Sequence, residues 1–342
     1  MADKLKLIRI GGTAYSGSTM LGLVLGNEDN GFYCGEVNGL YRPYREHHFQ
    51  PECGCGDPAC TIWKRAYLNT HDGQWLEALH HEVGKDFYID STKNYDWMYS
   101  ERGNDCYDFR HVVLWKTPEL YAASRFRRGK LKNWKEDYFN YYSRYFQLAD
   151  RSIAVNFSEF TRNTGEVLAQ LCRMLEIPYF DGKEEYWNKT QHSLFGNDSA
   201  MIHTAREGGA RSRELIERLS EKSARDDQQM SSQHRSIYVE KDVNKSLPES
   251  VLQDIREDKR LAQIVEQLQG NSACKVIDCK KHSLSLKTRA VVASHFIRKR
   301  VKAEKLMLAG RRTWNQQNVI DQEVVADPSL RERSSLAHEY LL

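Results

Sequence analysis

The chain has 342 residues, with 50 Lys and Arg against 47 Asp and Glu, a formal net charge of +3 and 40% hydrophobic residues. This balance is typical of a folded globular protein and argues against a chain that binds nucleic acid along its whole length. No stretch contains the eighteen or more apolar residues of a membrane helix, and the N-terminus has no continuous apolar signal segment. We therefore expect a cytoplasmic protein without a transmembrane segment, whose eight cysteines are thiols.

The first predicted elements are a strand at residues 5–10, a loop of small residues from Gly11 to Thr19, and a helix. Three further strands are expected at residues 87–90, 111–115 and 153–157, each followed by a polar turn and a segment with helical spacing. Strands that alternate with helices predict an α/β fold in three layers around a parallel sheet.

Helices are predicted in the second half of the chain. After Phe160 the apolar positions Val167, Leu168, Leu171 and Leu175 form one helical face, with Thr161 or Asn163 as the expected cap. Residues 206–233 are polar and predict a mobile connection or an exposed helix. Residues 248–269 predict one charged amphipathic helix.

The loop from Gly11 to Thr19 has the composition of an anion site. Gly, Ser and Thr between a strand and a helix let backbone N–H groups, hydroxyls and the positive helix end approach an anion. The loop contains no Lys, and Ser18 follows Gly17 where nucleotide triphosphatases carry Gly-Lys-[Ser/Thr]. A simple strand-to-helix turn also explains the glycines, so the functional interpretation needs support from other segments.

That support comes from motifs that resemble the sulfotransferases using 3'-phosphoadenosine 5'-phosphosulfate (PAPS), in particular bacterial, carbohydrate and tyrosylprotein types. The segment from Tyr15 to Leu21 is similar to their 5'-phosphosulfate loop, written Arg-Ser-Gly-Ser/Thr-Thr-Leu-Leu. Lys116 and Ser124, eight residues apart after a strand, resemble the element that binds the 3'-phosphate. This spacing is the most specific single match.

Three shorter motifs follow the same pattern between residues 5 and 269. Gly35-Glu36 resembles the Gly-Glu whose carboxylate is the general base, and the segment from Asp90 to Lys93 resembles a strand-ending Asp-Ser-Ser-Lys. The segment from Gln191 to Asn197 resembles a later His-Ser-x-Gly-Gly-Asn turn. The resemblance therefore implies a catalytic domain over residues 1–269.

The resemblance implies sulfuryl transfer from PAPS to an acceptor hydroxyl, with 3',5'-phosphoadenosine as product and no required metal. Glu36 is the expected base and its pKa is expected to be raised, and Lys93 is expected to donate to the leaving oxygen. The fallback base is His192 or a histidine of the His47-His48 pair. Donor binding is expected from Gly12, Thr13, Tyr15, Ser16, Gly17, Ser18, Thr19, Lys116, Ser124 and Asn197. A carbohydrate acceptor is favoured, with a protein tyrosine or a small alcohol as the alternative.

Two departures from the family pattern keep other functions open. Tyr15 stands where the loop usually carries Arg or Lys, and Lys116 replaces an Arg, which exchanges a bidentate fork for a point charge. These changes suit a catalytically weak module that binds an anion or a nucleotide. An ATP-dependent kinase is a further alternative, which requires Mg²⁺.

Two features lie outside these motifs. Cys53, Cys55 and Cys60 lie within eight residues, which suggests zinc, but a structural zinc site takes four ligands, for which Cys34 or His47 are considered. We favour a structural loop near the acceptor entrance and assign no metal ligand.

Residues 270–342 are expected to form a basic, mainly helical extension, with eleven Lys and Arg and one acidic residue between positions 280 and 312. Two interpretations of this basic extension are open: a solvated helix that packs on the catalytic domain, or a surface that attracts an anionic partner.

Overall fold

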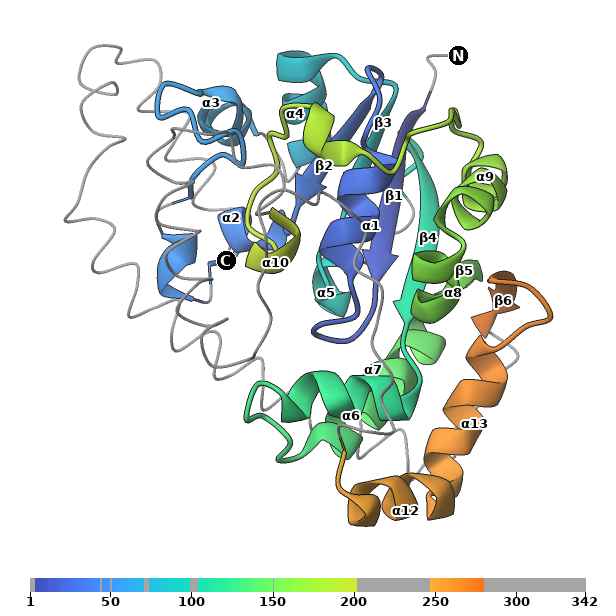
Figure 1. The fold of residues 1–342 in the computed structure, drawn as a ribbon. Helices are drawn as coiled ribbons and strands as arrows, with labels where there is room; N and C mark the ends of the chain where they lie inside the picture. Colours follow the sequence, from blue (N-terminus) through green and yellow to red (C-terminus); the bar gives the residue numbers. More distant parts are fainter. Residues whose placement is uncertain are drawn as a thin grey trace.

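The computed structural model describes residues 4–43, 45–49, 51–70, 74–98, 104–149, 151–201 and 247–279, which form a sheet with helices on both faces (Figure 1). The strands are β1 (Leu5–Gly11), β2 (Gly31–Gly35), β3 (Phe87–Asp90), β4 (Tyr107–Trp115), β5 (Arg151–Asn156) and β6 (Cys274–Asp278). The helices are α1 (Ser18–Leu25), α2 (Asn38–Tyr41), α3 (Ile62–Leu68), α4 (Trp75–Val83), α5 (Tyr95–Met98), α6 (Pro118–Phe126), α7 (Trp134–Leu148), α8 (Phe157–Arg162), α9 (Thr164–Leu175), α10 (Asp198–Met201), α12 (Glu249–Glu257) and α13 (Lys259–Leu268). Two single 3₁₀ turns lie at Glu46–His48 and Tyr186–Asn188.

The strands follow the order β2-β3-β1-β4-β5-β6. The first five are parallel, and β6 pairs antiparallel with β5 at the edge. The α/β fold built on a parallel sheet is therefore confirmed, and all four predicted strands are present. The antiparallel edge strand is an addition that the sequence pattern did not predict.

Apolar side chains alternate between the two faces of the sheet and bury helices on each. One face, including Ile8, Ile89 and Leu114, packs against α1, α8 and α9. The opposite face packs against α3 and α4 beside β2 and β3, and against α6, α7, α12 and α13 beside β4 and β5. This produces the three layers visible in Figure 1.

Four neighbouring parallel strands end at the same edge of the sheet. The register pairs Gly11 of β1 with Val113 of β4, and it pairs Asp90 of β3 with both Arg9 of β1 and Gly35 of β2. Open α/β sheets bind ligands beyond the carboxyl ends of their strands. The segments that follow β1, β2, β3 and β4 are therefore placed to form one site.

Helix α9 agrees with the prediction from the sequence pattern, whereas the helix predicted over residues 248–269 differs from it. Val167, Leu168, Leu171 and Leu175 are all buried on α9, as predicted. Residues 248–269 form two helices instead of one, because the chain is extended at Asp258, whose side chain accepts the backbone N–H of Arg260 and caps α13.

The region around residue 270 adds a strand to the sheet domain. Strand β6 follows the expected boundary at residues 269–270 and pairs along its whole length with β5. The first residues of the expected helical extension therefore belong to the sheet. Residues 206–233 and the basic stretch 280–312 lie outside the described residues.

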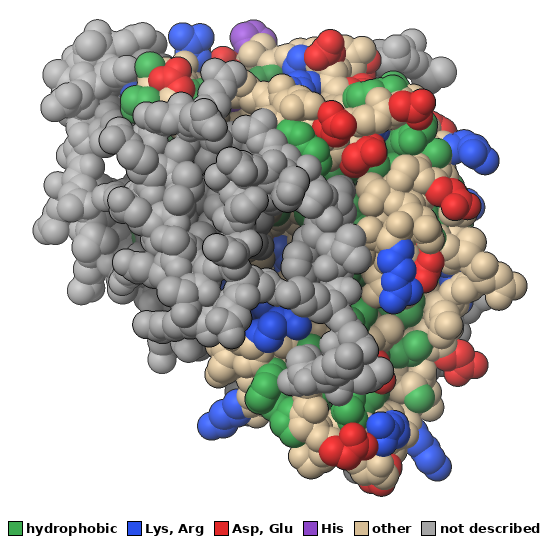
Figure 2. All heavy atoms as spheres, in the orientation of Figure 1, with side chains coloured by type: hydrophobic (Ala, Val, Ile, Leu, Met, Phe, Trp, Pro, Cys, Tyr) green, Lys and Arg blue, Asp and Glu red, His purple; other side chains and the backbone are tan. Residues whose placement is uncertain are grey.

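Within the described ranges, no helix has the length and apolar character needed to cross a membrane. Acidic and basic side chains lie interspersed on the described part of the face in Figure 2. This agrees with the near-balanced charge of the whole sequence.

Candidate functional site

The loop after β1 makes a tight turn into α1 that only glycine permits at one position. Gly17 precedes the helix with φ of 95°, and a Cβ atom there would lie 2.4 Å from the ring of Phe157. Both the left-handed backbone and the close ring therefore exclude a larger residue. Tyr15 is left-handed as well, with φ of 69°.

The predicted donor-binding residues of this loop are packed closely together. Thr13, Ser16, Ser18 and Thr19 are buried. The hydroxyl of Ser16 has no hydrogen-bond partner among the described residues, whereas the N–H of Gly12 already donates to the hydroxyl of Tyr141 on α7, 2.7 Å away. An unpaired buried hydroxyl costs free energy, and a bound anion removes that cost.

Lys116 and Ser124 form the second predicted binding element, and the structure brings them together. Lys116 follows β4, Ser124 lies on α6, and both are buried. The Nζ of Lys116 donates to the Oγ of Ser124 over 3.3 Å and lies 4.0 Å from the ring centroid of Phe157. Thr117 caps α6 by accepting the N–H of Leu120.

The two predicted anchors lie side by side. The ring of Phe157 contacts Lys116 and also limits the space at Gly17. Arg128 makes a second link, since its guanidinium donates to the carbonyl of Ser124 over 2.7 Å and its Cζ lies 4.3 Å from the ring centroid of Tyr15. A single ligand with two anionic groups therefore has both anchors within reach.

Tyr15 brings cations to the loop that lacks one of its own. Lys130 donates to the Tyr15 hydroxyl over 3.1 Å, and Arg128 lies over the ring. Burial alone raises the pKa of Tyr15, but the hydrogen bond from Lys130 and the charges of Lys130 and Arg128 outweigh it and lower the pKa. The positive charge missing from position 15 is therefore present beside it.

Glu36 and Lys93 meet because β2 and β3 are neighbours. The Nζ of Lys93 lies 2.6 Å from Oε1 of Glu36, and each side chain is about one fifth exposed. Asp90 holds the turn before Lys93, since its two carboxylate oxygens accept the N–H of Thr92 and the indole N–H of Trp97. The Asp90 of the motif thus has a structural role here.

The charge state of Glu36 differs from the expectation. Burial raises the pKa of Glu36, but the attraction and hydrogen bond of Lys93 outweigh burial and lower the pKa below its ordinary value. The raised pKa expected from the sequence is therefore wrong. His48, a neighbour of Glu36, has a pKa that is lowered to about 3, mainly by burial, so this histidine is neutral at physiological pH.

The segment of residues 191–197 joins Glu36 to the loop. Leu194 accepts the N–H of Glu36 and donates to the carbonyl of Cys34, and a Cβ atom on Gly35 would lie only 1.8 Å from the Leu194 oxygen. Further along, the N–H of Asn197 donates to Oγ1 of Thr19 over 3.1 Å. The backbone of Asn197 therefore contacts the loop, and donor binding by Asn197 stays a prediction.

His192 lies in a different environment from the one expected of a base. Its Nδ1 lies 3.4 Å from the sulfur of Cys53 and 3.5 Å from that of Cys60. The carbonyl of His192 also accepts the indole N–H of Trp63. The structure thus groups His192 with the cysteine turn, whereas Glu36 pairs with Lys93.

Sequence reasoning missed three residues that shape the site. Tyr141 accepts the Gly12 N–H, Phe157 contacts Lys116 and limits the space at Gly17, and Lys130 contacts Tyr15. No motif marks Tyr141, which reaches the loop from α7. Arg128, four residues after Ser124, contacts both anchors.

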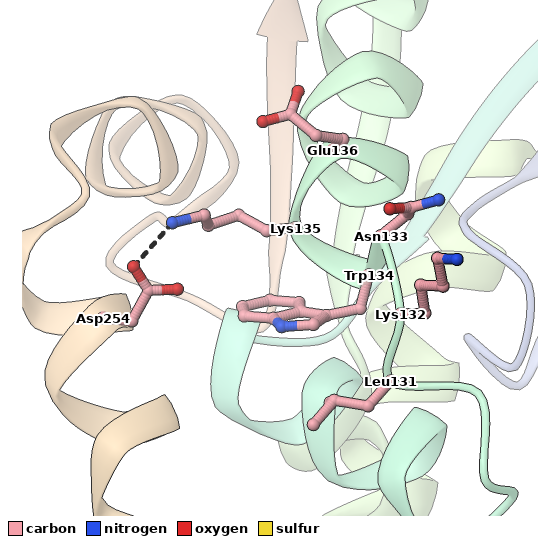
Figure 3. Close-up of a pocket in the computed structure, with 7 residues that line it drawn as sticks. All are labelled: Leu131, Lys132, Asn133, Trp134, Lys135, Glu136 and Asp254. Carbon is pink, nitrogen blue, oxygen red and sulfur yellow. Dashed lines mark hydrogen bonds and ion pairs between the residues drawn. The ribbon is translucent and has the colours of Figure 1, made fainter.

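An open pocket lies elsewhere, between the start of α7 and α12 (Figure 3). Lys135 on one side pairs with Asp254 on the other over 2.7 Å. None of the residues predicted for donor binding or catalysis lines this pocket, whose lining residues are Leu131, Lys132, Asn133, Trp134, Lys135, Glu136 and Asp254.

Comparisons with known proteins found similar structures only. No protein-family model matches the sequence, and no curated protein matches it. The sulfotransferase domain from the Synechococcus PCC 7002 olefin synthase has 15% sequence identity and a TM-score of 0.43, over 78% of this chain and 96% of that chain. A sulfotransferase domain from the curacin biosynthetic pathway has 12% identity and a TM-score of 0.45, over 78% of this chain and 98% of that chain.

Proposed function

We propose that this protein is a sulfotransferase that transfers a sulfuryl group from PAPS to an acceptor hydroxyl in the cytoplasm. The observation that carries the proposal is the contact between the two anchors, since Arg128 touches both Ser124 and Tyr15. None of the eight cysteines forms a disulfide in the structure, which agrees with a reducing compartment.

The donor fits the anchors by its charge distribution. Its 5'-phosphosulfate matches the loop, where Ser16 has an unpaired buried hydroxyl and the helix α1 begins. Its 3'-phosphate matches Lys116 and Ser124, whose polar atoms already face each other. Arg128 and Lys130 add charge between the two groups, which supports a ligand with phosphates at both ends.

Glu36 and Lys93 divide the chemistry on the acceptor side. Glu36 accepts the proton of the acceptor hydroxyl, and Lys93 donates to the leaving phosphate oxygen as the bond from sulfur to that oxygen breaks and the bond to the acceptor oxygen forms. The ammonium of Lys93 carries three N–H groups, so it can hold Glu36 with one and face the leaving oxygen with another. The lowered pKa keeps Glu36 ionised and ready to accept a proton.

We propose a carbohydrate acceptor, with a protein tyrosine or a small alcohol as the alternative. The charge of Arg45 acts on Glu36, and the neutral ring of His48 is a second neighbour of the same carboxylate, so both side chains lie near the base. The ring of Phe195 packs on that of His48, with 4.7 Å between their centroids. Flat rings beside a cation suit the apolar faces and hydroxyls of a sugar.

The direct test is turnover with PAPS and a panel of sugars, tyrosine peptides and small alcohols, with formation of 3',5'-phosphoadenosine as the readout. We expect turnover with at least one sugar and no loss of rate after removal of Mg²⁺. Tight binding of 3',5'-phosphoadenosine without turnover on the whole panel would favour a binding module. Dependence on ATP and Mg²⁺ would favour a kinase and overturn the proposal.

A further inference from the structure

Three cysteines and a histidine converge outside the proposed catalytic groups. The sulfurs of Cys53, Cys55 and Cys60 and one ring nitrogen of His192 all lie within 4.8 Å of one another, and all four residues are half-buried. His192 is 132 residues away from Cys60 in the sequence. The cysteine turn supplies three possible metal ligands, and the fold brings His192 to the same place as the fourth.

The distances match those of a tetrahedral metal site. Zinc bonds of about 2.3 Å to sulfur and about 2.0–2.1 Å to nitrogen, at tetrahedral angles, place the sulfur and nitrogen atoms about 3.5–3.6 Å apart. The sulfurs of Cys53 and Cys60 lie 3.4 and 3.5 Å from Nδ1 of His192. We propose that Cys53, Cys55, Cys60 and His192 bind one zinc ion in a closed structural site.

The donor set favours zinc over other occupants. Thiolate and imidazole ligands in a four-coordinate site are typical of structural zinc, whereas magnesium and calcium prefer oxygen ligands. A disulfide uses only two of the three sulfurs and leaves His192 without a role. None of the three cysteines forms a disulfide in the structure.

Backbone hydrogen bonds hold the cysteine turn in its ligating shape. The N–H of Gly56 donates to the carbonyl of Cys53, and the N–H of Cys60 donates to the carbonyl of Asp57. The carboxylate of Asp57 also accepts the N–H of Ala59. The indole of Trp63, on the helix that follows, fixes His192 through its carbonyl. The four ligands are thus oriented by contacts other than the metal bonds.

The zinc ion would fasten the segment that supports Glu36. Gly54, between two of the ligands, donates its N–H to the carbonyl of Ser193 over 2.8 Å, and Cys53 forms an isolated bridge with Leu194. Leu194 in turn accepts the N–H of Glu36. The metal therefore acts on the base through two short backbone contacts and has no open position for a substrate. His192 is a zinc ligand in this account, and Glu36 keeps the role of base.

Metal content tests the proposal without any activity assay. The full chain, expressed with zinc in the medium and purified without chelators, should contain one zinc ion per chain by elemental analysis. Cys60→Ser and His192→Ala should lose it. Cys106→Ser and His81→Ala are matched controls that should keep it, since Cys106 is exposed and the side chain of His81 is 85% exposed.

Cobalt substitution covers the case in which the variants fail to fold. Cobalt in the wild-type chain should give the visible absorption of a tetrahedral site with thiolate charge transfer, and His192→Cys should retain the metal with a shifted spectrum because four cysteines also bind zinc. Zinc-free wild type with a featureless cobalt spectrum overturns the proposal, as does full zinc content in His192→Ala. Neither result bears on PAPS turnover, so the two proposals fail separately.

Discussion

The nucleotide side and the acceptor side of the proposed site are built in different ways. On the nucleotide side, Lys116 and Ser124 belong to one strand–helix unit and are eight residues apart, and the loop is continuous from Gly11 to Thr19. On the acceptor side, Glu36, Lys93, His192 and the cysteine turn come from four separate segments. Each anchor of the nucleotide side is therefore encoded locally, whereas the acceptor side exists only after the chain has folded.

This difference explains why the roles of residues were easier to predict on the nucleotide side than on the acceptor side. A local spacing fixes which residues meet, so Lys116 and Ser124 pair as expected. Pairings between distant segments depend on strand order, and the sequence does not reveal that β2 lies beside β3. The contact of His192 with Cys53 and Cys60 likewise joins distant segments, which is why His192 was predicted only as a fallback base.

The largest effect is expected from Glu36→Gln, which removes the proposed base while keeping the side-chain shape. We expect kcat to fall by about 10²–10⁴-fold, the usual contribution of general base catalysis. Binding of 3',5'-phosphoadenosine, measured by calorimetry, should stay within about twofold because the anchors are unchanged. Glu166→Gln, on the exposed surface of α9, is the matched control. A loss of nucleotide affinity with an unchanged kcat would reverse the roles of the two sides.

A smaller effect is expected from Lys116→Met, which keeps the aliphatic contact with Phe157 and removes the charge. Hydrogen bonds to charged groups contribute about 1.5–3 kcal/mol, so the Kd for 3',5'-phosphoadenosine should rise by about 10–150-fold. Calorimetry measures the change, with Lys259→Met on α13 as an exposed control. An unchanged Kd would remove Lys116 from the binding site.

The pH dependence of turnover tests the pairing of Glu36 with Lys93. The ordinary pKa of a glutamate side chain is 4.5, and Lys93 lowers the pKa of Glu36 below that value. Glu36 therefore stays ionised as the pH falls to 4.5, and the wild-type rate should decline only below that pH. In Lys93→Met the burial of Glu36 is opposed only by the weaker attraction of neighbours such as Arg45, so its pKa rises and the acid limb of the residual rate should move to higher pH. An acid limb at the same pH in both proteins would contradict the pairing.

The smallest effect is expected from Tyr15→Phe. The ring continues to pack on Arg128, and only the hydrogen bond from Lys130 is lost. Since this partly exposed bond orients a cation without touching the ligand itself, the Kd for 3',5'-phosphoadenosine should rise by less than about threefold. A loss as large as that of Lys116→Met would mean that the Tyr15 hydroxyl binds the nucleotide directly.

Fold and site were predictable from the sequence to different extents. Four strands, α9 and the loop follow from patterns within a few residues, and all are present. Strand β2 was missed because Gly31–Gly35 mixes glycines with aromatic residues, and β6 because Lys275 and Asp278 interrupt its apolar positions. Such edge strands depend on their neighbours more than on their own residues.

The backbone at Phe195 shows the same limit. Phe195 stands where the related turn carries Gly. The structure places it at φ of 56°, a left-handed conformation that costs a residue with a side chain about 1–2 kcal/mol. Packing of its ring on His48 offsets part of this cost. Neither the strain nor its compensation can be predicted from composition.

The most direct test of the two-anchor account compares 3',5'-phosphoadenosine with 5'-AMP, which lacks the 3'-phosphate, by calorimetry on wild type and Lys116→Met. We predict that wild type binds 3',5'-phosphoadenosine at least about tenfold more tightly, and that Lys116→Met loses most of this preference while its weaker affinity for 5'-AMP is retained. Equal affinities of the wild type for the two nucleotides would contradict the account.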